Sequence, residues 1–172
     1  TKVARFPFDK FSDASNKLGT QMKATGEVMS IGRTMEESLL KAMRSLETGV
    51  CHIYHKKFED WTNDRLLEYI AEPTDDRLYA IAQLIRGGVD LVLIYNRTKI
   101  DMFFLEKFKN IVEFERVVEA APMDIEVLRE AKRMGFSDKF IGQLWGVSQH
   151  DMYLLREKNG IFPVYKLSLI HI

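Results

Sequence analysis

One stretch of sequence lies between a part without helical periodicity and a longer part with it: Gln21-Met-Lys-Ala-Thr-Gly-Glu-Val-Met-Ser-Ile-Gly-Arg-Thr34. It contains Gly26 and Gly32, and glycine suits a backbone at positive φ or a close approach of two backbones. We expect residues 27–31 to form a short strand between these glycines, with successive side chains on opposite faces. A phosphate-binding loop would need a glycine run that leads into Gly-Lys-Ser or Gly-Lys-Thr, or the dinucleotide glycine spacing, and the stretch has neither.

The composition is typical of a folded globular domain. Of the 172 residues, 46% are hydrophobic and 29% are charged, and a chain of this length can bury a substantial core. The 25 Lys and Arg balance the 25 Asp and Glu, so the electrostatic reason to expect nucleic acid or an anionic membrane as a partner is absent. No apolar run reaches the ~20 residues that a membrane-spanning helix needs. Cys51 is the only cysteine, which excludes an intrachain disulfide and fits a reducing compartment such as the cytoplasm.

Residues 1–33 predict a non-helical arm. They show no helical period, and Pro7 and Gly19 interrupt them. The arm carries three phenylalanines that need a surface to cover them, Phe6, Phe8 and Phe11. We therefore expect the arm to lie on a larger body.

From residue 34 onward the sequence predicts an all-α domain, compact and built from several helices. Thr34 and Glu37 have the spacing of a capping box. Residues 89–95 are short and β-branched enough for a strand, but their helical surroundings favour a helix. Caps, glycines and prolines delimit the expected helices, which are 34–48, 63–71, 74–86, 89–95, 98–120, 124–134, 137–145 and 148–159.

Apolar side chains at helical spacing predict the core of this domain. The clearest buried stripes are those of four helices: Leu39, Leu40, Met43 and Leu46; Leu66, Leu67 and Ile70; Leu78, Ile81, Ala82 and Ile85; and Phe104, Leu105, Phe108, Ile111, Val112 and Val118.

Cys51, His52, His55 and Asp60 lie close together in sequence and are residue types that bind metals. A closed zinc site needs four suitably spaced ligands, and a cysteine nucleophile needs a positioned base and a third group. A loop with one cysteine and two histidines meets neither requirement, so we expect no metal ligand here.

Three pairs of carboxylates occur: Glu36-Glu37, Asp75-Asp76, and Glu113 with Glu115. The first two pairs lie in the first turns of expected helices. Negative charge is favourable there because it faces the positive end of the helix dipole. This explanation leaves no catalytic, cofactor-binding or metal-binding residue to assign.

The segment Ser137–Arg156 has the layout of a helix-turn-helix, with Gly146 at the turn and Ser148 as the cap of the second helix. A DNA-reading module would need an excess of basic residues, because phosphate neutralisation supplies much of its affinity. Residues 137–158 instead carry three basic and three acidic side chains. We therefore favour a packed helical hairpin, with a nucleic-acid-binding module as the alternative function.

Several short motifs occur in the order of a known family, and together they run through most of the chain. They are Arg5-Phe6-Pro7-Phe8, Gln21-Met22-Lys23, Gly26-Glu27-Val28-Met29, Gly32-Arg33-Thr34, Asp76-Arg77-Leu78, Thr98-Lys99-Ile100-Asp101, Phe104-Leu105, Gly135-Phe136-Ser137-Asp138 and Pro163-Val164-Tyr165-Lys166. With these motifs the chain resembles the large subunit of carbamoyl-phosphate synthetase. Phe103 stands where that family usually has Trp, a mild apolar change.

The resemblance implies a division of the chain. Residues 1–33 would be the C-terminal end of the carboxyphosphate half, an ATP-grasp half, and residues 34–162 the helical oligomerisation domain. Residues 163–172 would be an exit linker toward the carbamoyl-phosphate half, with a tail after Lys166 that departs from the family pattern.

The resemblance also implies a function for the parent enzyme, which makes carbamoyl phosphate from bicarbonate, glutamine-derived ammonia and two ATP for arginine and pyrimidine synthesis. Its cofactors would be ATP and Mg (or Mn), and its partners other large subunits, the glutaminase small subunit and the two flanking synthetase halves. The family's nucleotide and metal ligands correspond to no position here, so we expect none in the chain and no activity of the chain alone.

Leu66 and Leu67 are the candidate residues for self-association. The short helix that carries them follows Trp61, and together they offer more apolar surface than one or two buried turns require. Burial of both leucines in the core is the alternative.

Overall fold

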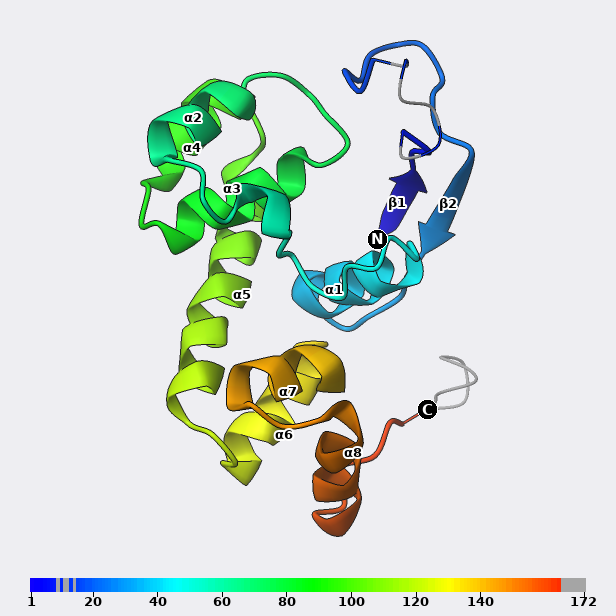
Figure 1. The fold of residues 1–172 in the computed structure, drawn as a ribbon, viewed down its shortest axis with the longest axis vertical. Coiled ribbons are helices and arrows are strands. Elements are labelled where there is room, and N and C mark those ends of the chain that lie inside the picture. The colour runs from blue at the N-terminus through cyan, green and yellow to red at the C-terminus, as the bar shows by residue number, and fades with distance from the viewer. Residues whose placement is uncertain (9, 11–12, 14, 165–172) are drawn as a thin grey trace.

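The computed structural model describes residues 1–8, 10, 13 and 15–164 and shows a helical body with a two-stranded ribbon at one side (Figure 1). Phe11 and most of the exit segment, including the atypical tail, lie outside the described residues. Within them the elements are β1 (Lys2–Arg5), β2 (Gly26–Met29), α1 (Met35–Ser45), η1 (Lys56–Phe58), α2 (Asn63–Tyr69), α3 (Arg77–Arg86), α4 (Leu91–Thr98), α5 (Met102–Ala120), α6 (Ile125–Arg133), α7 (Asp138–Trp145) and α8 (Gln149–Lys158). The prediction of an all-α domain with a short non-helical arm is confirmed.

Helix α5 is the axis of the body. It packs against α1, α3, α4, α6 and α7, and Figure 1 shows α2, α3 and α4 around one end of it and α6, α7 and α8 around the other. Its buried side chains include Leu105, Phe108, Ile111, Val112 and Val118, as the helical spacing predicted. One continuous core therefore joins the two ends of the body along this helix.

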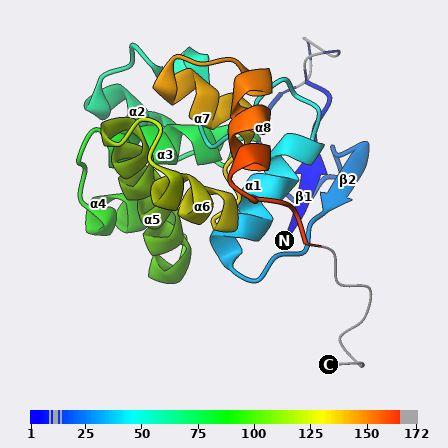
Figure 2. The ribbon, with the colours of Figure 1, turned by 90° about the horizontal axis from the view of Figure 1, so that it is seen from below.

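The arm is attached to the body through α1. Strands β1 and β2 pair antiparallel, with Val3 opposite Val28, and both strands contact α1. The expected strand after Gly26 is confirmed, although it begins at Gly26 and ends at Met29. Figure 2 shows the ribbon lying beside α1, on the opposite side of the body from α4.

Side-chain caps set most helix starts, and two of them differ from the prediction. Thr34 Oγ1 accepts from Glu37 N at 3.2 Å as expected, but Glu37 Oε2 accepts from Arg33 N at 2.7 Å, one residue before the cap. Asp101, and not Thr98, caps α5, because its Oδ1 accepts from Phe103 N at 2.8 Å while Thr98 closes α4.

Two further helix ends were predicted wrongly. Helix α1 ends at Ser45, ahead of Gly49, because Glu47 already takes a positive φ of 54°. Helix α3 begins only at Arg77, since Thr74 pairs with Lys17 in an isolated bridge and its hydroxyl bonds to Asp76 at 2.9 Å. The segment at residues 89–95 is confirmed as helical, starting one residue after Asp90.

Phe104 is the clear error in the predicted core, with 44% of its surface exposed. It lies in the first turn of α5 beside Leu105, which is fully buried. Spacing along one helix therefore predicted that this turn packs into the core, but not which of its apolar side chains the neighbouring helices cover.

Gly135 couples the end of α6 to α1. Its φ is +91°, and a Cβ atom placed there would lie 3.0 Å from Glu37 Cα and 3.1 Å from Glu37 O. Both contacts are with backbone, which cannot move aside cheaply. Arg44 also donates from Nη1 to the Gly135 carbonyl, so α1 and the α6–α7 turn touch at this residue.

We predict that Gly135→Ala destabilises the domain more than a matched substitution at Gly146. Gly146 has φ +69° with nothing within 4 Å of its Cβ position, so Gly146→Ala should cost only the left-handed conformation, about 1–2 kcal/mol. Gly135→Ala adds a backbone clash, which should cost roughly 1–3 kcal/mol more. Urea unfolding of the two variants measures the difference, and equal losses would contradict the proposed contact.

Candidate functional site

A buried ionic cluster holds α3, α5 and the loop after α1 together. Glu115 in α5 accepts from Arg86 Nε at 2.8 Å and Arg86 Nη2 at 2.7 Å, and from His52 Nε2 at 2.8 Å. Arg86 Nη2 also donates to the Ile53 carbonyl at 3.0 Å. The bidentate Arg–carboxylate pair is a strong geometry for a buried charge.

The charges in this cluster follow from burial and partners. Burial lowers the pKa of His52, and its hydrogen bond to Glu115 offsets this only in part. Burial alone would raise the pKa of Glu115, but the hydrogen bonds and charges of His52 and Arg86 bring it below its usual value. His52 is therefore neutral, with its proton on Nε2 facing the carboxylate, and Glu115 and Arg86 form the ion pair.

His52 also contacts the other end of the body. Its ring stacks on Phe140 of α7, with centroids 3.7 Å apart, and lies 4.8 Å from Phe136. An imidazole enclosed by aromatic rings and a carboxylate is placed to support packing.

The remaining metal-type residues are not brought together. Cys51 is a half-buried free thiol, and His55 caps η1 by accepting from Lys57 N at 3.1 Å. In the described part of the chain, no three His, Cys, Asp or Glu side chains converge as a metal site would require.

The carboxylate pairs have partners beyond the helix dipole. Glu36 is buried and accepts from Asn110 Nδ2 at 2.9 Å, which ties α1 to α5. Asp76 accepts from Lys57 Nζ at 2.6 Å and from Tyr69 Oη at 2.5 Å. Glu36 and Glu37 lie in the first turn of α1 as predicted. The same prediction for Asp75-Asp76 is wrong, because α3 begins only at Arg77 and both carboxylates precede it.

The segment 137–156 folds as a packed helical hairpin. Ile141 of α7 and Met152 of α8 are fully buried, and a Cβ at Gly142 would lie 2.6 Å from the Val147 carbonyl. Arg156, one of the three cations counted there, donates to Asp138 Oδ2 from Nη2 at 2.7 Å and from Nε at 3.0 Å. This pairing removes a cation from the surface that a nucleic-acid reader would need.

The structure separates the two candidate self-association residues. Leu66 is only 1% exposed and belongs to the core, so it does not offer a surface. Leu67 is partly buried at the edge of the core. Trp61, which precedes α2, packs edge-on against Phe58 and Tyr69. The Arg65 guanidinium lies over the Trp61 ring, 3.7 Å from its centroid.

A family model described as the carbamoyl-phosphate synthetase large chain, oligomerisation domain, matches residues 27–160. The chain belongs to this family. The match begins in β2 and ends just after α8, so it covers the whole helical body that α5 organises. In this oligomerisation domain, none of the described helices is both long and apolar enough to cross a bilayer.

The Glu115 cluster was not predicted from the sequence, although a signal was present. Glu115 lies four residues after Ile111 and three after Val112, on the buried stripe of α5. A carboxylate at such a position demands a cationic partner. The sequence alone does not say which of 25 Lys and Arg residues supplies it.

We predict that the oligomerisation domain loses stability as the pH falls below about 6.5, the usual pKa of histidine in an unfolded chain. Because the pKa of His52 is lowered in the folded state, the unfolded state takes up the proton first, and the free energy of unfolding decreases. Denaturant unfolding of the wild type and of His52→Gln between pH 7.5 and pH 5.5 tests this. The variant should show a weaker pH dependence, and parallel curves would exclude His52 as its source.

Proposed function

We propose that the chain is the connecting and assembly domain of a carbamoyl-phosphate synthetase large chain and acts by joining subunits. The family match over residues 27–160 carries this proposal. Buried charged clusters that brace the helices agree with a structural role, because each charge in them is used by a partner within the domain.

We further propose that the parent enzyme forms carbamoyl phosphate from bicarbonate, glutamine-derived ammonia and two ATP, with Mg (or Mn), in the cytoplasm. Its partners would be the flanking synthetase halves and a glutaminase small subunit, and its product would feed arginine and pyrimidine synthesis. In this proposal the domain supplies no catalytic residue and is inactive alone. The motif order given above, from Arg5-Phe6-Pro7-Phe8 onward, supports it.

Leu67 is the residue that we propose for the self-association surface. It lies on α2, a helix of seven residues that also carries Arg65 and Tyr69, both in contact with the Trp61 ring. Aromatic and arginine side chains such as Trp61 and Arg65 are enriched at protein interfaces. A partly buried leucine beside them would complete its burial against a second copy.

The test is Leu67→Glu, followed by sedimentation velocity with a parallel thermal melt. At an interface the introduced charge disfavours only association, so the dimer should be lost while the melting temperature of the monomer is kept. Leu66→Glu is the contrasting variant, because a charge in the core costs several kcal/mol and should unfold the domain.

Leu93→Glu is the matched control on another exposed apolar position, since Leu93 of α4 is 52% exposed. We expect it to leave both the mass and the melting temperature unchanged. If Leu93→Glu breaks the dimer and Leu67→Glu does not, the surface lies on α4 and the assignment to Leu67 is wrong.

A further inference from the structure

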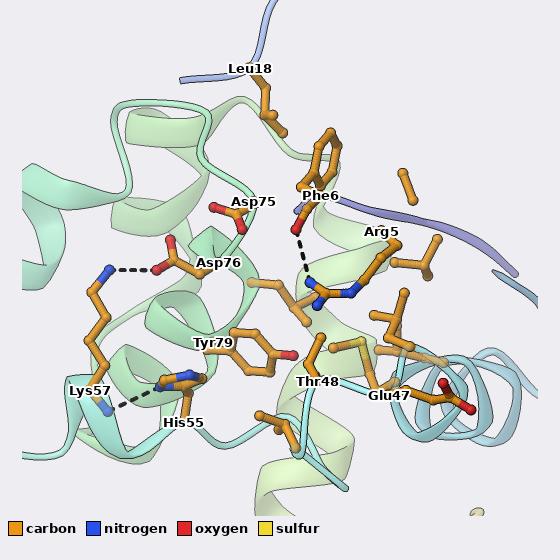
Figure 3. Close-up of a pocket in the computed structure, with 17 residues that line it drawn as sticks. Arg5, Phe6, Leu18, Glu47, Thr48, His55, Lys57, Asp75, Asp76 and Tyr79 are labelled. Carbon is orange, nitrogen blue, oxygen red and sulfur yellow. Dashed lines mark hydrogen bonds and ion pairs between the residues drawn. The ribbon is translucent and has the colours of Figure 1, made fainter. Parts of the chain in front are cut away.

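A cavity of about 430 Å³ lies between the N-terminal arm and the helical body (Figure 3). Its size falls in the range of small-molecule sites, which are mostly apolar with a few convergent polar groups. The apolar lining comes from both parts of the chain: Val3, Ala4, Phe6 and Leu18 from the arm, and Leu39, Met43, Leu46, Val50 and Leu78 from the body.

The described part of the arm meets the body at two places beside this cavity. At one place β1 pairs with β2 and contacts α1. At the other Leu18 N donates to the Pro73 carbonyl at 2.6 Å, and Lys17 Nζ lies 2.5 Å from Glu72 Oε2. Residues 3–6 and Leu18 therefore form one wall of the cavity.

Polar groups gather at the start of α3, where they line the cavity. Tyr79 is only 7% exposed, and Figure 3 shows its hydroxyl directed toward Thr48. Burial, with the negative charges of Asp75 and Asp76 nearby, raises the pKa of Tyr79 to about 12. Its hydroxyl is therefore a neutral donor and acceptor at the cavity wall.

Asp75 is the lining carboxylate that the body leaves without a cation. Its neighbour Asp76 is paired with Lys57 at 2.6 Å, whereas no ion pair reaches Asp75 from the described residues. Asp75 is exposed and lies on the solvent side of the cavity, where partial desolvation, and then repulsion by Asp76, raise its pKa. Both effects would be relieved by a cation placed beside it.

The charges around the cavity specify the occupant. The lining carries three acidic side chains, Glu47, Asp75 and Asp76, and two basic ones, Arg5 and Lys57. Lys57 is held by Asp76, and Arg5 donates to the Phe6 carbonyl at 2.9 Å. We propose that the cavity binds a small organic ammonium compound with an apolar body, whose ammonium group pairs with Asp75 and whose apolar part lies against Phe6, Met43 and Leu78.

Such a ligand would clamp the arm to the body, because its apolar part touches both walls at once. Binding would stabilise the contacts that residues 3–6 and Leu18 make with the body. This inference does not depend on self-association through Leu67.

The experiment uses 2-phenylethylamine as the probe, with 2-phenylethanol and 3-phenylpropionate as matched neutral and anionic probes. Binding to the full chain is measured by isothermal titration calorimetry and by nuclear magnetic resonance shifts of Tyr79 and Leu78. We expect the amine to bind at least about tenfold more tightly than either control, since a hydrogen bond to a charged partner contributes on the order of 1.5–3 kcal/mol.

Three variants assign the site. Asp75→Asn should remove the preference for the amine, while Glu47→Gln, a carboxylate change on the same cavity, should keep it. Ala4→Leu, which fills the cavity from β1, should weaken all probes. Hydrogen exchange measures whether the ligand holds the arm against the body. The backbone amides of residues 2–5 and 18 should exchange more slowly when the amine is bound.

Several results would overturn the proposal. They are failure of the amine to bind the wild type, equal affinities for the three probes, or an amine preference that survives Asp75→Asn but not Glu47→Gln. Circular dichroism of each variant establishes that it is folded, and Ala4→Leu provides a test of the cavity that does not alter any charge.

Discussion

The carboxylate of Glu115 is the constraint on which the arrangement of the body depends. A charge at this depth costs several kcal/mol in desolvation unless its partners are positioned well. Glu115 obtains them from two distant segments, Arg86 at the end of α3 and His52 in the loop after α1. The packing of α5 is therefore tied to the register of α3 and to the path of residues 50–55.

The same cluster reaches the second end of the body through aromatic contact. His52 stacks on Phe140 of α7, and Trp145 of α7 donates from Nε1 to the Val118 carbonyl of α5 at 2.6 Å. Helix α1 adds a third connection by the Glu36–Asn110 hydrogen bond. The proposed role of joining subunits requires a domain that does not deform, and these contacts fix each end of the body to α5.

The local parts of the fold could be predicted because their causes are local. Serine and aspartate caps and glycine stops defined α6, α7 and α8 almost to the residue, as with Ser137, whose Oγ accepts from Phe140 N at 3.1 Å. Thr98 and Thr74 misled the prediction because both hydroxyls bond elsewhere in the folded chain.

What depends on distant segments could not be predicted. The packing around α5 leaves Phe104 exposed while it buries Leu105 in the same turn, and the partners of Glu115 lie 29 and 63 residues away in sequence. Helical spacing alone did not distinguish Leu66 from Leu67 as the exposed residue. The structure, in which α2 packs on α3, shows that Leu66 is buried. The cavity beneath the arm likewise arises from segments that meet only after folding.

A double-mutant cycle on Arg86 and Glu115 tests most directly whether this buried pair holds the body together. Arg86→Met and Glu115→Leu each leave one buried charge without its main partner, so each should lower the free energy of unfolding by roughly 3–5 kcal/mol. The double variant removes both charges, and its loss should fall short of the sum of the single losses by about 2 kcal/mol or more. Losses that simply add would contradict the account.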